Sequence, residues 1–237
     1  MKIVSWNCKM AYRNKAESIL KLNPDIAIIP ECENIGEQTP KRLWFGDNFK
    51  KGLGIYSYSA FNLELIGQYN PKLRHIIPIR ATGPAEFNLF AVWAMNDTQG
   101  RRKRYIGQIW LALNEYKEML DKPTIIVGDF NSNIIWDLKG HYGLYGNFTE
   151  VVRKLEEHNI FSAYHQFYKE EFGKETRPTL FMYHDKNKSY HVDYCFTSSD
   201  FVLKSVEVGA YADWIAYSDH VPLIITLDNS KKLDGLI

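Results

Sequence analysis

Five short polar segments of this chain carry side chains that suit the hydrolysis of a phosphate ester. Each segment ends or follows an apolar, strand-like run, so a folded sheet can bring their carboxylate, amide and imidazole groups to one edge. In chain order the segments are Ser5-Trp6-Asn7, Pro30-Glu31, Gly128-Asp129-Phe130-Asn131-Ser132, His191-Val192-Asp193-Tyr194 and Ser218-Asp219-His220. Together they predict metal-assisted attack of water on phosphate.

The second segment offers the best candidate for a metal ligand. Hydrolysis of a phosphodiester can require an enzyme to lower the barrier by upwards of ~20 kcal/mol, which calls for a divalent cation, a base and hydrogen-bond donors. Glu31 follows the apolar run 26–30, so we expect it where a buried strand reaches the sheet edge. Mg²⁺ takes oxygen ligands and keeps several waters, so Glu31 with the amide oxygen of Asn7 would suffice. Taken singly, Glu31 also fits a helix cap and Asn7 a turn.

The third segment is the strongest local signal for a catalytic base. An apolar strand ends at Gly128, and Asp129 and Asn131 follow on either side of Phe130, which we expect in the core. Side chains at i and i+2 of an extended segment share one face, so Asp129 and Asn131 can converge on one substrate atom. One of them can take a proton from water while the other orients that water or bonds a phosphate oxygen. An ordinary Asp-x-Asn turn is the alternative.

The last two segments predict an imidazole that is supported by a carboxylate. If the strands that contain Asp193 and follow His220 are neighbours, the Asp193 carboxylate can bond one ring nitrogen of His220 and favour its charged form. A charged imidazole donates to phosphate, and Asp219 is then free to approach the metal. A single buried His bonded to Asp is more often structural, so this interpretation depends on the other segments.

The composition favours a globular domain with a sizeable core and no strong overall charge. The chain has 237 residues, and 45% of them are hydrophobic. The 29 Lys and Arg residues against 28 Asp and Glu leave a formal charge of +1, so any contact with a polyanion must be local. Cys8, Cys32 and Cys195 occur singly in apolar surroundings and are expected to be reduced core thiols, which indicates the cytoplasm. No charged leader, apolar span or cleavage site follows Met1, so we expect neither secretion nor membrane insertion.

The order of periodic segments predicts a single domain over residues 1–237, a monomer of α/β (α+β) class. Helical spacing occurs at 14–22, where Asn14 and Glu17 fit a capping box, at 105–120, and at 148–157, where Asn147 and Glu150 fit another. Strand-like runs occupy 2–6, 25–29, 54–58, 61–67, 74–80, 87–93, 123–127, 190–197, 202–208 and 221–227. The consecutive runs from 52 to 93 are expected to pair as antiparallel neighbours. This mixture favours two packed, mixed β-sheets flanked by helices.

The five segments resemble the motifs of the endonuclease/exonuclease/phosphatase family, the superfamily of deoxyribonuclease I and the exonuclease III type of apurinic endonuclease. The resemblance covers nearly the full chain, from Ser5-Trp6-Asn7 to Ser218-Asp219-His220, in the family's order. It implies a four-layered α/β sandwich and a hydrolase that depends on Mg²⁺ or Mn²⁺. The roles that it implies are metal binding by Glu31 with Asn7 and Asp219 nearby, water activation by Asp129, orientation of phosphate or nucleophile by Asn131, and an Asp193–His220 pair at the phosphate.

Two positions depart from the family pattern, and both bear on substrate binding. Many relatives place His or Tyr where this chain has Trp93, and an indole N–H donates a hydrogen bond but exchanges no proton. Asn96, three residues on, still fits a position that contacts phosphate. Lys9 stands where the apurinic endonucleases carry an aspartate near the metal, so either the metal shell differs or Lys9 meets phosphate directly. Both departures weaken the transfer of apurinic specificity.

The sequence leaves three classes of function open. A nuclease acting on DNA or RNA comes first, since the basic run 101–104 can track a phosphate backbone and the aromatic stretch 134–145 can stack on bases, although a solvated loop and core packing are the alternatives. A phosphoesterase for a small phosphorylated metabolite or lipid headgroup comes second, favoured by the near-neutral charge. The third is a binding protein that lost the chemistry, prompted by Trp93 and Lys9. It is disfavoured because every proposed proton-transfer and metal residue is present.

Overall fold

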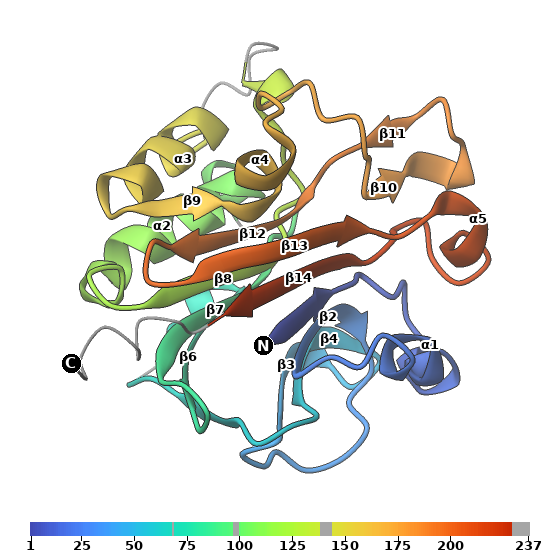
Figure 1. Cartoon of the computed structure of the whole chain (residues 1–237), viewed down its shortest axis with the longest axis horizontal. Coiled ribbons are helices and arrows are strands. Elements are labelled where there is room, and N and C mark those ends of the chain that lie inside the picture. The colour runs from blue at the N-terminus through green and yellow to red at the C-terminus, as the bar shows by residue number, and fades with distance from the viewer. Residues whose placement is uncertain (68, 97–99, 138–143, 229–237) are drawn as a thin grey trace.

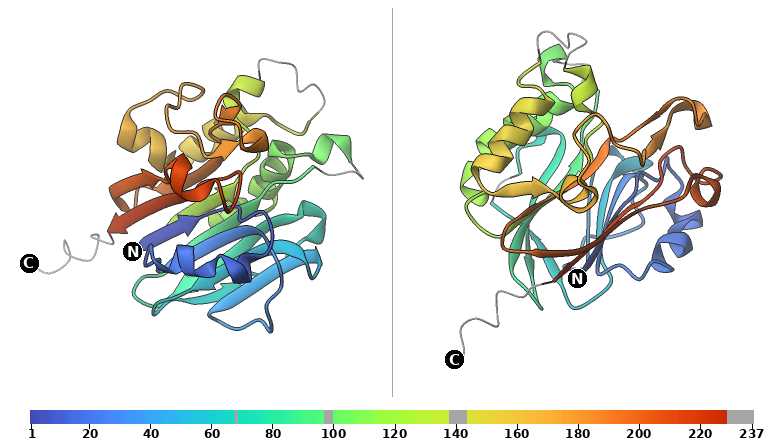
Figure 2. Two further views of the ribbon diagram at one scale, coloured as in Figure 1. Left: turned by 90° about the vertical axis from the view of Figure 1, so that its right-hand side faces the viewer. Right: turned by 45° about the horizontal axis from the view of Figure 1, so that its top comes forward.

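Two six-stranded β-sheets pack face to face in the computed structural model, which describes residues 1–67, 69–96, 100–137 and 144–228. The first sheet has the order β13-β14-β1-β2-β4-β3 and the second the order β5-β6-β7-β8-β12-β9. Figure 1 and Figure 2 show helices α2 and α3 outside the second sheet and α1 outside the first. The layers are therefore helix, sheet, sheet and helix, as the resemblance implied.

The first sheet joins the two ends of the chain. Its central strand β1 runs parallel to β2, with Ser5 paired to Ile28, and antiparallel to β14, with Ser5 paired to Leu223. The members of this sheet are β1 (Lys2–Ser5), β2 (Ile26–Cys32), β3 (Arg42–Asn48), β4 (Lys51–Ser57), β13 (Val202–Val208) and β14 (Leu223–Asp228).

The second sheet is built around β8, which runs parallel to β7 and antiparallel to β12. Its members are β5 (Asn62–Leu65), β6 (His75–Thr82), β7 (Phe87–Trp93), β8 (Thr124–Asp129), β9 (Ile160–Ser162) and β12 (Asp193–Ser198), and a separate two-stranded ribbon is formed by β10 (Leu180–Phe181) and β11 (Ser189–Tyr190). The helices are α1 (Ala16–Leu20), α2 (Ile106–Glu115), α3 (Phe148–Glu157), α4 (Ala163–Tyr168) and α5 (Tyr211–Trp214).

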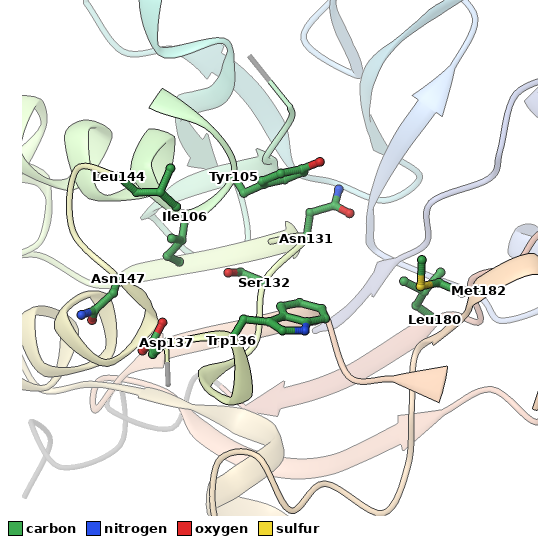
Figure 3. Close-up of a pocket in the computed structure, with 10 residues that line it drawn as sticks. All are labelled: Tyr105, Ile106, Asn131, Ser132, Trp136, Asp137, Leu144, Asn147, Leu180 and Met182. Carbon is green, nitrogen blue, oxygen red and sulfur yellow. The ribbon is translucent and has the colours of Figure 1, made fainter. Parts of the chain in front are cut away.

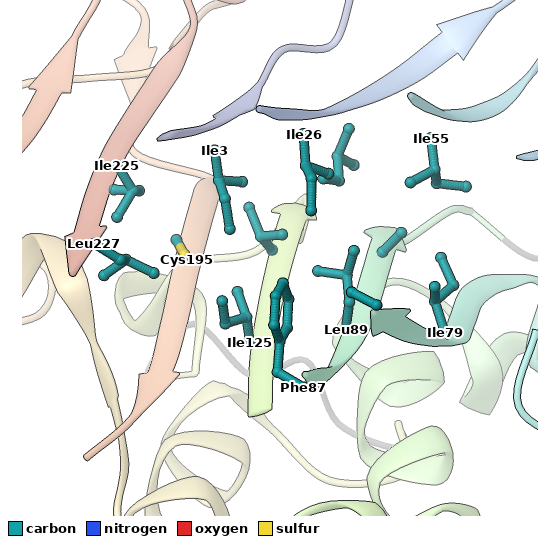
Figure 4. Close-up of a cluster of buried hydrophobic side chains, with 14 of the residues drawn as sticks. Ile3, Ile26, Ile55, Ile79, Phe87, Leu89, Ile125, Cys195, Ile225 and Leu227 are labelled. Atoms are coloured by element: carbon teal, nitrogen blue, oxygen red, sulfur yellow. The ribbon is translucent and has the colours of Figure 1, made fainter. Parts of the chain in front are cut away.

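The core lies mainly between the two sheets. Figure 4 shows Ile3 and Ile26 of the first sheet facing Ile125 and Leu89 of the second, and all four are fully buried. Separate apolar clusters lie under α2 and α3 and under α1 and α5, which explains why central strands such as β2, β7 and β8 are buried on both faces. This packing fixes the relative position of the two sheets, whose strand ends carry the polar segments.

Several predicted elements are confirmed by the structure. The runs 87–93 and 202–208 are strands with those bounds, and 148–157 is a helix whose Asn147 side chain accepts from the Glu150 N–H at 2.8 Å. The three cysteines are buried and free of disulfides, as predicted. Among the residues that the structure describes, no helix is long and apolar enough to span a membrane.

Two structural predictions were wrong in part or whole, and one strand was missed. The run 54–58 belongs to β4 of the first sheet and 61–67 to β5 of the second, so these two strands do not pair, because the chain crosses between sheets after Ser57. The next strands, β5, β6 and β7, do pair as antiparallel neighbours, as predicted. Asn14 ends a 3-10 turn, and α1 begins after Lys15 without a side-chain cap, because the preceding residues take left-handed conformations. Strand β3 was not predicted, because only the short run 43–45 is apolar there.

Candidate active site

The end of β8 is shaped by a glycine that lets two strands approach closely. Gly128 has a φ of 147°, and a Cβ there would lie 1.9 Å from the Val92 carbonyl oxygen, so a side chain at this position would push β7 and β8 apart. Asp129 follows directly and is paired in register with Asp193 of β12 on one side and Trp93 of β7 on the other. The local sequence thus places one carboxylate opposite another at the same sheet edge.

Asp129 is held by two side-chain amides. Its Oδ2 accepts from Asn7 Nδ2 at 3.0 Å and from Asn131 Nδ2 at 2.9 Å, and its Oδ1 accepts from the Asn131 backbone N–H at 2.8 Å. Asn131 has a φ of 46°, a left-handed conformation that Asn tolerates better than most residues, while Phe130 is buried beneath it. Three predicted residues, Asn7, Asp129 and Asn131, therefore form one hydrogen-bonded group around a buried carboxylate.

Asp193 and His220 form a buried pair that joins the two sheets. His220 Nδ1 lies 2.8 Å from Asp193 Oδ2, and their side chains are 6% and 0% exposed. The strands concerned are not neighbours, which was the condition set for this bond in the sequence analysis. Asp193 begins β12 of the second sheet, and His220 lies just before β14 of the first. The predicted bond is present, but it forms across the sandwich.

The electrostatics of this group favour a charged imidazole beside a basic carboxylate. Burial raises the pKa of Asp129 above its usual range, and the nearby Asp193 carboxylate raises it further. Burial alone would lower the pKa of His220, but the Asp193 and Asp129 carboxylates raise it above the ordinary histidine value. A base and a proton-bearing imidazole thus stand side by side, which is the arrangement that general acid–base chemistry requires.

The same three residues meet a geometric condition for cation binding. One ligand atom each from Asp129, Asp193 and His220 lies within 4.8 Å of the others, and Asp193 Oδ1 is buried without a hydrogen-bond partner among the residues described. The oxygen-rich set fits a hard divalent ion such as Mg²⁺. A protonated imidazole has no lone pair for a metal, however, so His220 in its charged form is not a ligand. A cation near this group would then be bound by the neighbouring carboxylates alone.

Glu31 lies at a β-bulge beside this group. The register of β2 with β4 shifts between Pro30 and Cys32, and Glu31 has a φ of 62°, which is strained for a residue with a Cβ. Its carboxylate pairs with Lys51 Nζ at 3.0 Å and is 21% exposed. Bulges often re-aim a side chain at a functional site, and this one presents a carboxylate next to the strand that carries Asn7.

Lys9 and Asp219 form a second ion pair close to Asn7. Lys9 Nζ donates to Asp219 Oδ2 at 2.9 Å, and the Lys9 backbone N–H donates to Asn7 Oδ1 at 3.1 Å. Burial would raise the pKa of Asp219, but the hydrogen bond from Lys9 and the charge of His220 lower it below its usual range. Both residues of the pair are therefore charged and linked to the Asp129 group through Asn7.

The two remaining predicted residues differ in exposure. Trp93 is 3% exposed, stacks on His75 with ring centroids 4.9 Å apart, and has Lys51 Nζ 5.4 Å from its centroid. This burial gives the indole a packing role and does not support the predicted direct contact with substrate. Asn96 is exposed, and residues 97–99 beyond it lie outside the described part of the chain, so its contact with phosphate stays a prediction.

An aromatic-walled cavity of about 280 Å³ opens beside Asn131. Figure 3 shows Tyr105 and Trp136 on opposite walls with Asn131 between them, and Leu180 and Met182 close one side. Trp136 belongs to the aromatic stretch that the sequence analysis singled out, of which residues 138–143 lie outside the described chain. The cavity can receive a flat or apolar group attached to a phosphate held at Asp129.

Several residues that organise the site were missed by sequence reasoning. Ser218 Oγ donates to the Asn7 carbonyl oxygen at 2.7 Å and accepts from the His220 N–H at 3.1 Å, although only its place in the fifth segment hinted at a role. Thr179 Oγ1 accepts from the Asp193 N–H at 3.0 Å. Thr179 and Lys51 stand outside every motif, so no local signal could have found them.

Comparisons with known structures gave proteins of the same fold at low identity. A variant of the 3′ phosphatase NExo from Neisseria, bound to a product DNA hairpin, has a TM-score of 0.72 and 19% identity over 96% of this chain and 99% of that chain. An AP endonuclease from Archaeoglobus fulgidus has a TM-score of 0.65 and 16% identity, covering 96% and 99% of the two chains. D. rerio TDP2 complexed with a single strand DNA product has a TM-score of 0.65 and 16% identity, covering 96% and 98%.

The sequence comparisons identify the family. No curated protein sequence gave a significant match. The family model described as Endonuclease/Exonuclease/phosphatase family matches residues 4–220, which include all five polar segments. The chain therefore belongs to the Endonuclease/Exonuclease/phosphatase family and is a hydrolase of phosphate esters.

Proposed function

We propose that this protein is a Mg²⁺-dependent nuclease, which hydrolyses phosphodiester bonds in DNA or RNA. The observation that carries the proposal is the buried group in which Asp129, held by Asn7 and Asn131, stands beside the Asp193–His220 pair. This group supplies a proton acceptor and a cationic donor within the reach of a single phosphoryl group.

In the proposed reaction Asp129 takes a proton from water, and the resulting hydroxide attacks phosphorus as the ester oxygen leaves. Asn131 orients the water or a phosphate oxygen through its amide. His220 uses Nδ1 for Asp193, so Nε2 is the nitrogen that can donate to a non-bridging phosphate oxygen. Asp193 keeps the ring oriented and charged while negative charge builds on the phosphoryl oxygens.

We propose that Glu31 and Asn7 hold the divalent ion, with Asp219 nearby. Glu31 offers a carboxylate, and Asn7 an amide oxygen with a second lone pair beyond its bond to the Lys9 N–H. When bound, Mg²⁺ or Mn²⁺ would neutralise phosphate charge and lower the pKa of coordinated water. The Lys51 ammonium at Glu31 shows that this carboxylate already accommodates positive charge.

The choice of nucleic acid rests on the surroundings of the cavity. The Arg102 guanidinium lies 4.3 Å from the Tyr145 ring centroid, and the Tyr145 N–H donates to the Arg102 carbonyl oxygen at 2.8 Å. The basic segment therefore lies against the chain that lines the cavity, where Tyr105 and Trp136 suit stacking on a base. The similar NExo and TDP2 structures are described as bound to DNA products, which supports the same class here.

A phosphoesterase for a small phosphorylated metabolite or headgroup is the second candidate. The formal charge of +1 and the cavity of about 280 Å³ beside Asn131 both suit a compact ligand. Salt separates the two candidates, because a polymer that contacts several phosphates binds with a steep dependence on salt concentration and a small ligand with a shallow one. We place the protein in the cytoplasm because its cysteines are free, and we infer a single domain over residues 1–237 because β1 pairs with β14. We propose that it is a monomer.

A panel of DNA, RNA and small phosphate esters assayed with Mg²⁺, Mn²⁺ or EDTA tests the proposal. We expect cleavage of nucleic acid that EDTA abolishes, and a loss of orders of magnitude in Asp129→Asn. Asp121→Asn is the matched control, because Asp121 forms an exposed pair with His158. Turnover of small esters alone would favour the second candidate, and full activity of Asp129→Asn would reject the assigned base.

A further inference from the structure

Lys9 is held in an unusual backbone conformation next to the proposed metal ligands. Lys9, Met10 and Ala11 have φ values of 51°, 69° and 52°, so three successive residues with a Cβ adopt the left-handed region. Such residues cost free energy and persist only where the surroundings hold them. Here the Met10 N–H donates to the Glu31 carbonyl oxygen at 3.0 Å, which ties the strained segment to the bulge in β2.

The Lys9 ammonium is fixed by two partners. Nζ donates to Asp219 Oδ2 at 2.9 Å and lies 3.1 Å from His184 Nε2. His184 Nδ1 lies 3.1 Å from the Ile215 carbonyl oxygen and so carries the ring proton, which leaves Nε2 as the acceptor from Lys9. Among the described residues these contacts use two of the three N–H donors, so one remains for a substrate oxygen.

The position of this ammonium conflicts with a metal ion at Asp219. A divalent ion bound by the same carboxylate would stand within a few ångströms of a fixed positive charge, in a site where Asp219 is largely buried. Glu31 is also paired with a lysine, Lys51, but the Lys9 ammonium is held by a second partner, His184, as well as by its carboxylate. The side chain of Lys9 is 44% exposed, so an incoming phosphate can reach it.

We propose that the Lys9 ammonium is the counter-ion of the Asp219 carboxylate in place of a metal. The site then binds one divalent ion, at Glu31, and Lys9 contacts the substrate phosphate directly. The inference rests on the proposed metal-dependent function and refines it. The ammonium neutralises Asp219 without any bound metal, whereas the ion at Glu31 comes from solution. Lys9 thereby performs at one carboxylate the charge neutralisation that a second ion would otherwise supply.

Counting the Mn²⁺ ions bound per protein tests the proposed single metal site without any substrate. Electron paramagnetic resonance of free Mn²⁺ in titrations of the purified protein should give one bound ion for the wild type and two for Lys9→Asp, because that change removes a cation and adds a carboxylate. Lys204→Asp is the matched control, since Lys204 forms a surface pair with Asp228 at 3.3 Å, and it should still bind one ion. Two ions in the wild type, or one in a folded Lys9→Asp, would overturn the proposal.

A second pair of variants keeps the test informative if Lys9→Asp does not fold. Asp219→Asn should change Mn²⁺ affinity less than threefold, while Glu31→Gln should weaken it by at least about 10- to 100-fold, the usual cost of disturbing a metal shell. An equal loss in Asp219→Asn would show that Asp219 is a ligand and contradict the proposal. Lys9→Met should lower kcat/KM about 10- to 100-fold, the loss expected for a charged hydrogen bond, with one Mn²⁺ still bound. A protein that binds no Mn²⁺ would instead refute the proposed metal dependence.

Discussion

Changing Asp193 to Asn should lower the pKa of His220 and so shift the pH dependence of catalysis. In the wild type the structure raises the pKa of His220 to about 10, because the Asp193 and Asp129 carboxylates overcome the lowering effect of burial. Without the Asp193 charge we expect the pKa of His220 to fall, since the lowering effect of burial is then opposed only by the Asp129 and Asp219 carboxylates. The charged fraction of His220 at a given alkaline pH therefore falls, and kcat there should drop by about tenfold for each unit by which the pKa comes to lie below the assay pH.

Asp193→Asn should also change the pKa of Asp129, the proposed base. The Asp193 carboxylate contributes to raising the pKa of Asp129 to about 7, after burial itself, so its removal lowers that pKa. The wild-type profile should rise as pH increases through Asp129 ionisation and fall as His220 loses its proton. In Asp193→Asn both limbs should move to lower pH, whereas a merely structural defect would reduce activity equally at every pH.

The assay combines kcat profiles at saturating Mg²⁺ with NMR titration of the His220 ring. Asp121→Asn supplies the matched control, because it changes an exposed Asp–His pair with a 2.8 Å contact. Breaking one side of a buried pair costs about 3–5 kcal/mol of stability, so folding of Asp193→Asn is checked by circular dichroism before kinetics. A His220 pKa that does not fall in Asp193→Asn, or a profile with unmoved limbs, would refute the reasoning.

Three further predictions concern stability as well as activity. Burial lowers the pKa of His75 from 6.5 to about 4. The neutral ring therefore favours the folded state above pH 6.5, and up to about 3 kcal/mol of the free energy of unfolding is lost as pH falls toward 4. Urea unfolding of His75→Phe should show a correspondingly flatter pH dependence. Glu31→Gly should leave the free energy of unfolding within about 1 kcal/mol of the wild type, because relief of the left-handed strain offsets the lost Lys51 pair. Mg²⁺-dependent turnover should fall at least about 100-fold. A large loss of stability would argue against strain at this bulge. Gly128→Ala should cost at least about 2 kcal/mol in urea unfolding, since its Cβ would meet the Val92 carbonyl oxygen, and an unchanged midpoint would contradict the close strand spacing.

The strand ends of the site could be predicted because their signals are local. Asp129 and Asn131 follow an apolar run at a spacing of two, and the structure places them in direct hydrogen-bond contact. The contact forms through the Asp-x-Asn turn that was the alternative, because Asn131 is left-handed and its N–H donates to Asp129 Oδ1. Phe130 between them is buried, as the alternation required. Strand β7 was predicted with its observed bounds for the same reason, since seven consecutive residues of suitable type end at Trp93.

The partners of these residues could not be predicted, because they depend on how the two sheets pack. Asp193 and His220 come from different sheets, and nothing in either segment indicates that the bond crosses the sandwich. The pairing of Glu31 with Lys51 depends on a bulge at a residue other than glycine, for which the sequence carries no local signal. The left-handed run that begins at Lys9 likewise contradicted the helix cap expected downstream.

Three carboxylates of the site have a cationic partner before any metal binds, while Asp129 is held by the Asn7 and Asn131 amides. Glu31 pairs with Lys51, Asp219 with Lys9 and Asp193 with His220, at 3.0, 2.9 and 2.8 Å. These pairs reduce the repulsion between carboxylates where the polar edges of the two sheets meet, although the Asp193 charge still raises the pKa of Asp129.

These existing ion pairs also determine which cation a divalent ion must displace when it binds. At Glu31 the ion has to displace only Lys51, whose side chain is 38% exposed and can swing into solvent. At Asp193 it would have to displace an imidazolium that is almost fully buried, and water could not replace the lost contact. The difference in exposure therefore favours Glu31 over Asp193 as the place where the exchangeable cation enters. Exposure does not distinguish Glu31 from Asp219, since the Lys9 side chain is 44% exposed, but the Lys9 ammonium contacts both Asp219 and His184.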